Sequence, residues 1–191
     1  MEQFLIGSSV FLWVIVVFNL FLTLALIRRL NTKSQISDLS SGLKKGELAP
    51  NFEAETLSGT KINLSTFANQ AVTFIFVSPN CQPCREALPT YESLYSKAKL
   101  LEIKLVLVVS SDIIRTQAFV NELNINLPVI VAPRETNTFL EDYNVRGTPS
   151  YCLIDETGTA QSAGFASSNS ADWNGIVTSW KERISILEVS S

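Results

Sequence analysis

The length, composition and charge of this chain exclude several classes of function before any motif is considered. It has 191 residues, a formal net charge of −3 and no histidine. A weakly acidic chain without a basic run gives no electrostatic reason to expect a nucleic-acid partner. The absence of histidine excludes Cys–His zinc sites, Ser-His-Asp and Cys-His nucleophile pairs, and His-ligated haem.

The first apolar run is long enough to span a membrane. The run from Phe4 to Ile27 carries no charge, and a helix of this length, at about 1.5 Å per residue, crosses a hydrocarbon core of about 30 Å. A cleaved signal peptide is the alternative, but it would have a basic start, a shorter apolar run and a small-residue cleavage site. The sequence therefore predicts a retained anchor over residues 1–30, a polar linker over 31–46 and one domain over 47–191.

From residue 47 onward, strand patterns alternate with helix patterns. Asn51–Glu55 and Lys61–Asn63 are predicted to form a hairpin around Ser58-Gly59. Continuous apolar runs then predict strands that are buried on both faces, and patterns with a helical period predict helices between them. These elements are a strand at Ala71–Val77, a helix over 82–98, a strand at Leu101–Val109, a helix over 112–123, a strand at Leu127–Val131 and a helix over 135–143.

The last third of the chain is predicted to add a second hairpin and a final helix. Strands at Tyr151–Ile154 and Ala160–Phe165 flank the turn Glu156-Thr157-Gly158. An amphipathic helix is predicted over Ala171–Leu187. Alternating strands and helices followed by a hairpin and a helix indicate an α/β sandwich around one mixed sheet.

Two of the three cysteines, Cys81 and Cys84, lie in the stretch S-P-N-C-Q-P-C-R, between a predicted buried strand and a predicted helix. Three cysteines without histidine are one ligand short of a structural zinc site. Arg85 stands where a c-type haem attachment would need histidine. We therefore expect no metal and no cofactor, and the chemistry that remains is that of a dithiol.

The predicted helix start assigns different roles to the two cysteines. Unpaired backbone N–H groups and the helix dipole favour a thiolate there, and can lower a cysteine pKa from about 8.5 to about 3.5–7.5. Cys81 is therefore predicted to be the attacking thiol and Cys84, one turn later, the resolving thiol of a redox-active disulfide. Two unrelated buried cysteines are the alternative. Cys152, in a predicted buried strand, is interpreted as a small core residue rather than a regulatory thiol.

Residues 47–191 resemble the thioredoxin superfamily. The resemblance rests on the strand-loop-Cys-x-Pro-Cys-helix element and on Gly147-Thr148-Pro149 before a strand, where the superfamily carries a cis-proline loop that faces the disulfide. It implies a thioredoxin-like three-layer sandwich with a mixed sheet, preceded here by one N-terminal transmembrane helix. It also implies that Pro149 is cis, and that Thr148 and Pro149 form a substrate groove in which the Thr148 backbone pairs with a client strand.

Two further stretches narrow the resemblance. G-E-L-A-P-N-F at 46–52 and L-S-G-T-K-I-N-L at 57–64, together with the anchor, resemble the TlpA- and ResA-like branch and, more closely, the MauD-like proteins of methylamine utilisation. This resemblance implies thiol–disulfide exchange with protein clients outside the cytoplasm and a membrane-bound or soluble redox partner. For MauD-like proteins it implies maturation of the disulfide-rich small subunit of methylamine dehydrogenase.

The chain departs from these families beside the dithiol. Asn80 replaces the tryptophan that usually precedes the first cysteine, and Ala87 replaces the glutamate of ResA-like proteins. The buried aspartate of thioredoxin would fall near Ile75. The expected proton acceptor for the buried thiol is therefore missing. Glu86 either substitutes for it or, as an exposed carboxylate, only stabilises the helix.

Two other functions remain as alternatives. The A-P-x-F opening and the general layout are shared with peroxiredoxin-type peroxidases. Of the proline and the threonine or serine that those enzymes place before the reactive cysteine, the first is Phe74 here and the second is retained as Ser78. Arg146 is a candidate for the arginine that a peroxidase needs near its thiolate. An inactive thioredoxin-like adaptor is the third interpretation, and replacing Cys81 by serine would distinguish it.

The charges beside the anchor and the chemistry of the dithiol place the domain on opposite sides of the membrane. Arg28, Arg29 and Lys33 follow the apolar run and no Lys or Arg precedes it, so the positive-inside rule alone places the domain in the cytoplasm. A dithiol enzyme has its disulfide-bonded clients in an oxidising compartment. We therefore expect a single-pass protein of the cell (inner) membrane with an extracytoplasmic, periplasmic domain.

Overall fold

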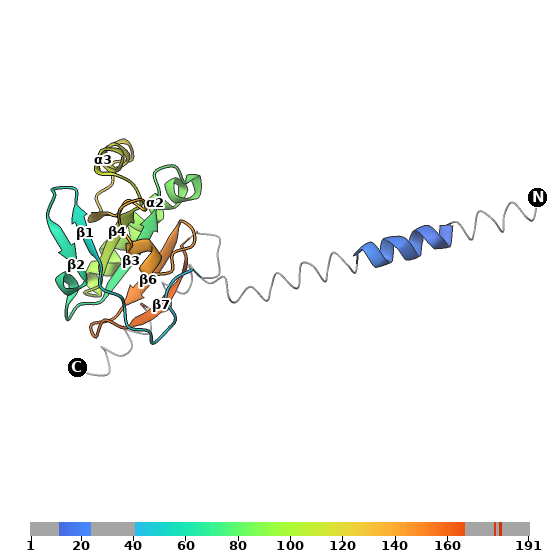
Figure 1. The fold of residues 1–191 in the computed structure, drawn as a ribbon, viewed down its shortest axis with the longest axis horizontal. Coiled ribbons are helices and arrows are strands. Elements are labelled where there is room, and N and C mark those ends of the chain that lie inside the picture. Colours follow the sequence, from blue (N-terminus) through green and yellow to red (C-terminus); the bar gives the residue numbers. More distant parts are fainter. Residues whose placement is uncertain (1–11, 24–40, 167–177, 179, 181–191) are drawn as a thin grey trace, which may run out of the picture. The chain divides into compact units, whose positions relative to one another are not determined.

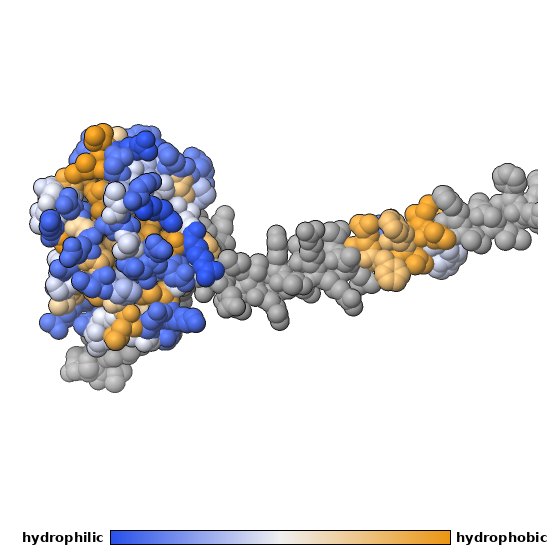
Figure 2. Space-filling model, viewed as in Figure 1, coloured by the Kyte–Doolittle hydropathy of each residue, from blue (hydrophilic) through white to orange (hydrophobic). Residues whose placement is uncertain are grey.

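The computed structural model describes residues 12–23, 41–166, 178 and 180, and the chain divides into two compact units, Met1–Leu39 and Ser40–Ser191 (Figure 1). In the first unit, residues 12–23 form a helix with exposed apolar side chains (Figure 2). Within the described ranges, no helix has both the length and the apolar character that a membrane span needs. The predicted anchor, Phe4–Ile27, extends past these ranges at both ends and stays a prediction.

A seven-stranded mixed sheet forms the centre of the second unit (Figure 1). Its strand order is β2-β1-β5-β4-β3-β6-β7. Strands β3, β4 and β5 pair in parallel, and the other neighbouring pairs are antiparallel. The predicted mixed sheet is confirmed. The strands are β1 (Glu53–Thr56), β2 (Lys61–Asn63), β3 (Val72–Val77), β4 (Lys104–Val109), β5 (Val129–Val131), β6 (Ser150–Ile154) and β7 (Ala160–Phe165).

The central strands are apolar along their length because both faces of the sheet are covered. Every residue of β3 is buried, as is every residue of β4 except Lys104. The register pairs Val77 with Val109 and Val109 with Val131, so the carboxyl ends of β3, β4 and β5 lie at one edge of the sheet. In open α/β sheets this edge is where ligands bind.

Helices pack on both faces of the sheet and create the three layers predicted from the sequence. On one face, α2 (Gln82–Leu100) and α3 (Ile113–Glu122) contribute Tyr91, Leu94 and Phe119 to a largely aliphatic core. On the other face lies α4 (Phe139–Asp142), with an aromatic core in which the Phe139 ring stacks on Phe52 at 3.7 Å. A short 3-10 helix, η2 (Leu64–Phe67), is an element that the sequence reading missed.

Three predicted elements differ from the structure at their ends. The strand predicted from Leu101 begins at Lys104, because α2 continues to Leu100 and Glu102 then turns the chain with a φ of 57°. The helix predicted over 135–143 shortens to α4, whose N-cap is Thr138, because the Asn137 side chain accepts the Phe139 N–H and so competes with helical hydrogen bonding before that residue. Of the predicted helix Ala171–Leu187, residues 178 and 180 are described and helical.

The predicted linker, 31–46, ends inside the folded unit rather than before it. Ser41 and Leu43 are buried, and the Gly42 N–H donates to Asn144 O at 3.0 Å. Gly42 has a φ of +107° and lies against Ala163, where a Cβ would collide with that side chain. The chain is thus tied to the domain from Ser41 onward.

Candidate active site

Cys81 and Cys84 form a disulfide at the first turn of α2, with their Cα atoms 5.2 Å apart. Cys81 is the N-cap residue of the helix, and its extended backbone (φ −90°, ψ 105°) leads the chain from the end of β3 into α2. Pro83 lies in the first turn, where its missing N–H removes no helical hydrogen bond. Cys81 is partly exposed and Cys84 is fully buried, so solvent reaches the first cysteine but not the second.

The backbone of the first turn is arranged to hold negative charge on the Cys81 sulfur. The Cys84 N–H donates to Cys81 Sγ at 3.2 Å, which makes the sulfur the acceptor that a capping side chain normally provides. The same helix end presents the positive pole of the helix dipole. A thiolate formed at Cys81 on reduction would therefore meet a hydrogen-bond donor that is already in position.

The Gly147-Thr148-Pro149 loop, predicted to face the dithiol, lies beside it. Thr148 O is 3.4 Å from Cys81 Sγ, and the Thr148–Pro149 peptide bond is cis, as predicted. Pro149 is buried and Thr148 is partly exposed, so the Thr148 backbone lies at the accessible edge of the site. The structure thus brings Cys81, Cys84, Thr148 and Pro149 together, and their roles in catalysis and client binding stay predictions.

Ser41, near the end of the predicted linker, supports this loop, a contact that sequence reasoning missed. Ser41 Oγ lies 2.9 Å from Ser150 Oγ and accepts the Arg146 N–H at 3.2 Å. Ser150 Oγ in turn donates to Gly147 O at 2.6 Å. A serine in a polar tether gives no sequence signal for such a contact, because it forms only when segments more than 100 residues apart meet.

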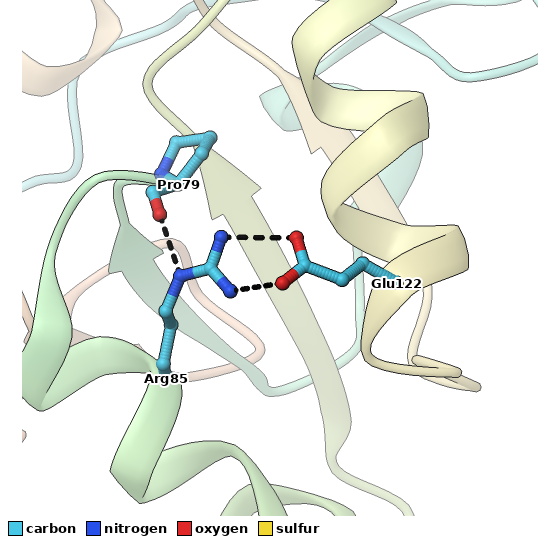
Figure 3. A network of polar contacts seen from close by, with 3 residues as sticks. All are labelled: Pro79, Arg85 and Glu122. Carbon is cyan, nitrogen blue, oxygen red and sulfur yellow. Dashed lines mark hydrogen bonds and ion pairs between the residues drawn. The ribbon is translucent and has the colours of Figure 1, made fainter.

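A second support holds the loop that carries Cys81, and the sequence did not predict it either. The Arg85 guanidinium donates from Nε to Pro79 O at 2.9 Å and forms two bonds to the Glu122 carboxylate, at 2.7 and 3.1 Å (Figure 3). The Arg85 guanidinium carbon also lies 5.5 Å from the ring centroid of Phe119. The hydrogen bond from Arg85 lowers the pKa of Glu122, so the pair is charged at neutral pH. One side chain therefore connects the Cys81 loop, α2 and α3.

No carboxylate takes the place of the proton acceptor missing from the sequence, among the residues that the structure describes. Ile75 is buried in β3 and Ala87 is buried in α2. Glu86 is exposed, and it accepts a hydrogen bond from Gln82 Nε2 at 3.0 Å on the helix surface. The described part also contains no group of three or more His, Cys, Asp or Glu side chains that could hold a metal ion.

Cys152, the third cysteine, has a different environment from the Cys81–Cys84 pair. It is a free thiol at the centre of β6, opposite Phe74 of β3 and Ala163 of β7, and its exposed fraction is 0%. Burial raises the pKa of the Cys152 thiol to about 12. Its predicted burial in the core is confirmed.

A disulfide at a helix N-terminus, a facing cis-proline loop and a mixed sheet with helices on both faces define the thioredoxin-like class. Residues 45–163 match the AhpC/TSA family, and the chain belongs to this family.

Relatives and solved structures agree with this assignment. The chain is 31% identical over 123 residues to the thioredoxin-like protein YneN of Bacillus subtilis (strain 168), covering 63% of this chain and 71% of the relative. It is 29% identical over 114 residues to the thiol-disulfide oxidoreductase ResA of Bacillus thuringiensis subsp. konkukian (strain 97-27), covering 59% of this chain and 65% of ResA. The thioredoxin domain of a thiol-disulfide oxidoreductase from Bacteroides vulgatus superposes with a TM-score of 0.59 at 20% identity, over 72% of this chain and 98% of that domain. This structural likeness concerns the fold.

Proposed function

We propose that this protein is a membrane-anchored thiol–disulfide oxidoreductase that exchanges disulfides with extracytoplasmic proteins. The observation that carries the enzyme class is the Cys81–Cys84 disulfide at the start of α2, with Thr148 O 3.4 Å from the accessible sulfur. The ResA relatives, which are named thiol-disulfide oxidoreductases, support the same class.

The exposure of the two sulfurs supports a separate step for each of them in the exchange. The Cys81 thiolate attacks one sulfur of a client disulfide, which forms a mixed disulfide and releases the other client sulfur as a thiolate. Cys84 then attacks Cys81 Sγ, which restores the Cys81–Cys84 disulfide and releases the second client thiolate. The client gains two electrons and the enzyme loses two. The reverse sequence oxidises a client dithiol, and the reduction potentials of the two partners set the direction.

Cys84 must lose its proton before the second step, and its surroundings provide no carboxylate for this among the described residues. The thiolate that leaves the client in the first step is a base of ordinary thiol strength, with a pKa of about 8.5. We propose that this client thiolate, or water that enters with it, takes the proton from Cys84. The missing aspartate or glutamate then makes the second step slower without preventing it.

The test of the enzyme class is trapping of the mixed disulfide. The reduced Cys84→Ser protein should accumulate a covalent adduct with a disulfide-bonded client such as insulin, because the resolving thiol is absent. The wild-type protein should reduce the same client without accumulating an adduct. A Cys81→Ser protein that still reduces the client would contradict the role of Cys81 as the attacking thiol. It would also show that the Cys81–Cys84 pair does not carry the activity.

We further propose that the domain lies outside the cytoplasm, tethered to the inner membrane by residues 4–27, and that its clients include the small subunit of methylamine dehydrogenase. The long uncharged run supports the anchor, the need for an oxidising compartment supports the location, and the resemblance to MauD-like proteins supports the client. Reporter fusions after residue 46 should be active only when the reporter works in the periplasm. Activity of a reporter that works only in the cytoplasm would favour the positive charges at Arg28 and Arg29 instead.

The peroxidase alternative is not favoured. Cys81 is paired with Cys84 one helical turn away, and Phe74 lies buried in β3 where a peroxidase would carry proline. Arg146 donates from Nε to Asn144 Oδ1 at 3.3 Å, and it belongs to the segment held by Ser41.

A further inference from the structure

A polar pocket opens beside the dithiol, at the edge of the sheet where β3, β4 and β5 end. Its volume is about 450 Å³. The segments that follow these three strands line it, and the cis-proline loop closes one side with Gly147 and Thr148. Because Thr148 O is 3.4 Å from Cys81 Sγ, a client cysteine bonded to Cys81 would place its neighbouring residues at the mouth of this pocket.

Ser111 is the residue of this pocket that indicates a polar ligand. It lines the pocket and is only 9% exposed, yet its hydroxyl makes no hydrogen bond to any residue in the described part of the chain. The hydroxyl of the preceding residue, Ser110, is satisfied by Val77 O at 3.1 Å. Buried hydroxyls are nearly always paired, and leaving one unpaired is unfavourable. A polar group that enters the pocket would provide the missing partner.

The charges that line the pocket cancel. Arg115 and Asp112 form one pair, with Arg115 Nε 3.5 Å from Asp112 Oδ2. Arg134 and Glu135 bring a second positive and a second negative group, and Arg134 Nη2 donates to Val145 O at 3.1 Å. A pocket with two groups of each sign has no net charge with which to select an acidic or a basic partner.

The remaining lining residues are neutral, and all of their side chains except those of Pro79 and Gly147 can form hydrogen bonds. Ser78 is partly exposed, Asn80 is exposed, and both belong to the loop that precedes Cys81. Asn80 therefore brings an amide to this wall of the pocket. Hydroxyls and an amide can both donate and accept hydrogen bonds, which suits a partner that does the same.

We propose that this pocket receives a side chain one or two residues from the client cysteine and selects Ser, Thr, Asn or Gln over apolar residues. This inference rests on the proposed function and assigns the specificity of the same site. Ser111 would contact the client side chain directly. In an extended client, residues lie about 3.3 Å apart along the strand, so positions next to the reacting cysteine are within reach of the pocket.

The test uses peptides whose single cysteine is joined to thionitrobenzoate, and the full-length reduced protein. Cys81 attacks the peptide sulfur and releases coloured thionitrobenzoate, and Cys84 then releases the peptide thiol, so electrons and atoms balance within each turnover. In separate peptides, each of the two residues on either side of the cysteine is Ser, Asn, Val, Leu, Asp or Lys. We expect the second-order rate constant for thionitrobenzoate release in this single turnover to be roughly fivefold higher for the Ser and Asn peptides than for the Val and Leu peptides at one position at least, the effect of one neutral hydrogen bond. The Asp and Lys peptides should be slower than the Ser and Asn peptides.

The substitution Ser111→Ala should reduce this preference to less than about twofold, mainly by slowing the reaction of the Ser and Asn peptides. Ser93→Ala is the matched control, because Ser93 lies on α2 outside the pocket and its hydroxyl donates to Thr90 O at 2.7 Å. If S111A does not fold, Ser78→Ala tests the same wall and should also lower the preference. Equal rates for all peptides, a preference for apolar ones, or a preference that S111A or S78A leaves intact would overturn the inference. Failure of the wild-type protein to react with any peptide would instead overturn the proposed function.

Discussion

The thiol group occurs in two opposite settings in this molecule, at the start of α2 and in the middle of β6. Cys81 caps a helix, is partly exposed, and its sulfur accepts the Cys84 N–H at 3.2 Å. Cys152 is fully buried between two neighbouring strands, and burial raises its thiol pKa to about 12. The comparison shows that the same residue type becomes a redox group or a packing group according to its place in the secondary structure.

The physical cause lies in the use of backbone hydrogen bonds. Inside a sheet, the N–H and C=O groups of a central strand bond to the neighbouring strands. A backbone hydrogen bond from Leu43 lowers the pKa of the Cys152 thiol, but the opposite effect of burial is larger. At a helix N-terminus, the first N–H groups have no partner in the helix and point toward any anion placed there. The difference between Cys81 and Cys152 therefore follows from where each lies along its element, and the following substitutions and measurements test it.

The largest expected effect is on disulfide exchange. Cys81→Ser should reduce turnover of a disulfide client by roughly a thousandfold or more, because the nucleophile is lost. Cys152→Ala should leave turnover within about twofold of wild type, because its thiol is buried and unused. Reduction of insulin with a recycling dithiol as electron source measures both. Equal losses in the two variants would break the comparison.

The next effect is on alkylation of the reduced protein. Raising the pKa of Cys152 from 9.0 to about 12 lowers its thiolate fraction about a thousandfold at neutral pH, and burial blocks the reagent as well. Iodoacetamide at pH 7 should therefore label Cys81 first and Cys152 only after unfolding in denaturant. Mass spectrometry of digested samples gives the order of labelling. Early labelling of Cys152 in the folded protein would show that β6 opens more readily than its packing indicates.

A smaller effect concerns stability at alkaline pH. The pKa of Cys152 is raised in the folded state, so its contribution to stability is complete below the ordinary thiol pKa. That contribution is lost as the pH rises toward about 12, because the unfolded chain releases the proton first. The loss approaches about 1.4 kcal/mol per pH unit for one group.

Urea unfolding of the wild-type and Cys152→Ala proteins at pH 7 and at pH 10 measures this dependence. The variant should lose less stability between the two pH values. It should still lose some, because burial also raises the pKa values of Tyr91 and Tyr143. An identical pH dependence in the two proteins would remove Cys152 as its source.

The smallest expected effect concerns the support of the loop that carries Cys81. Arg85→Met removes the hydrogen bond to Pro79 O and should slow client exchange roughly two- to fivefold, because the loop that carries Cys81 is held less well. Glu122→Gln is the matched variant, since it removes one charge of the pair and leaves the bond to Pro79, and it should change the rate less. Labelling of Cys152 should be unaffected in both. A larger effect in E122Q than in R85M would place the function in the ion pair rather than in the loop.

Much of the fold followed from local sequence patterns, and the errors have identifiable causes. The apolar runs predict β3 and β4, and a pattern with a helical period predicts α2. The predicted helix over 135–143 was wrong at its start, because the Asn137 side chain competes for the backbone there. Such side-chain to backbone hydrogen bonds depend on the local geometry, and the hydrophobic pattern does not indicate them.

By itself, the sequence determined the dithiol and its local setting. A buried strand, a short loop and a helix that opens with Cys81 and contains Cys84 one turn later are defined by residues that are close along the chain. The tertiary structure decided what surrounds that dithiol. Thr148 and Cys81 are 67 residues apart in the sequence. Thr148 O lies near Cys81 Sγ because β6 pairs antiparallel with β3, which puts the loop before β6 beside the start of α2. The Ser41 support, the Arg85–Glu122 pair and the pocket that Ser111 lines likewise arise where distant segments meet, and no pattern along a single segment indicates them.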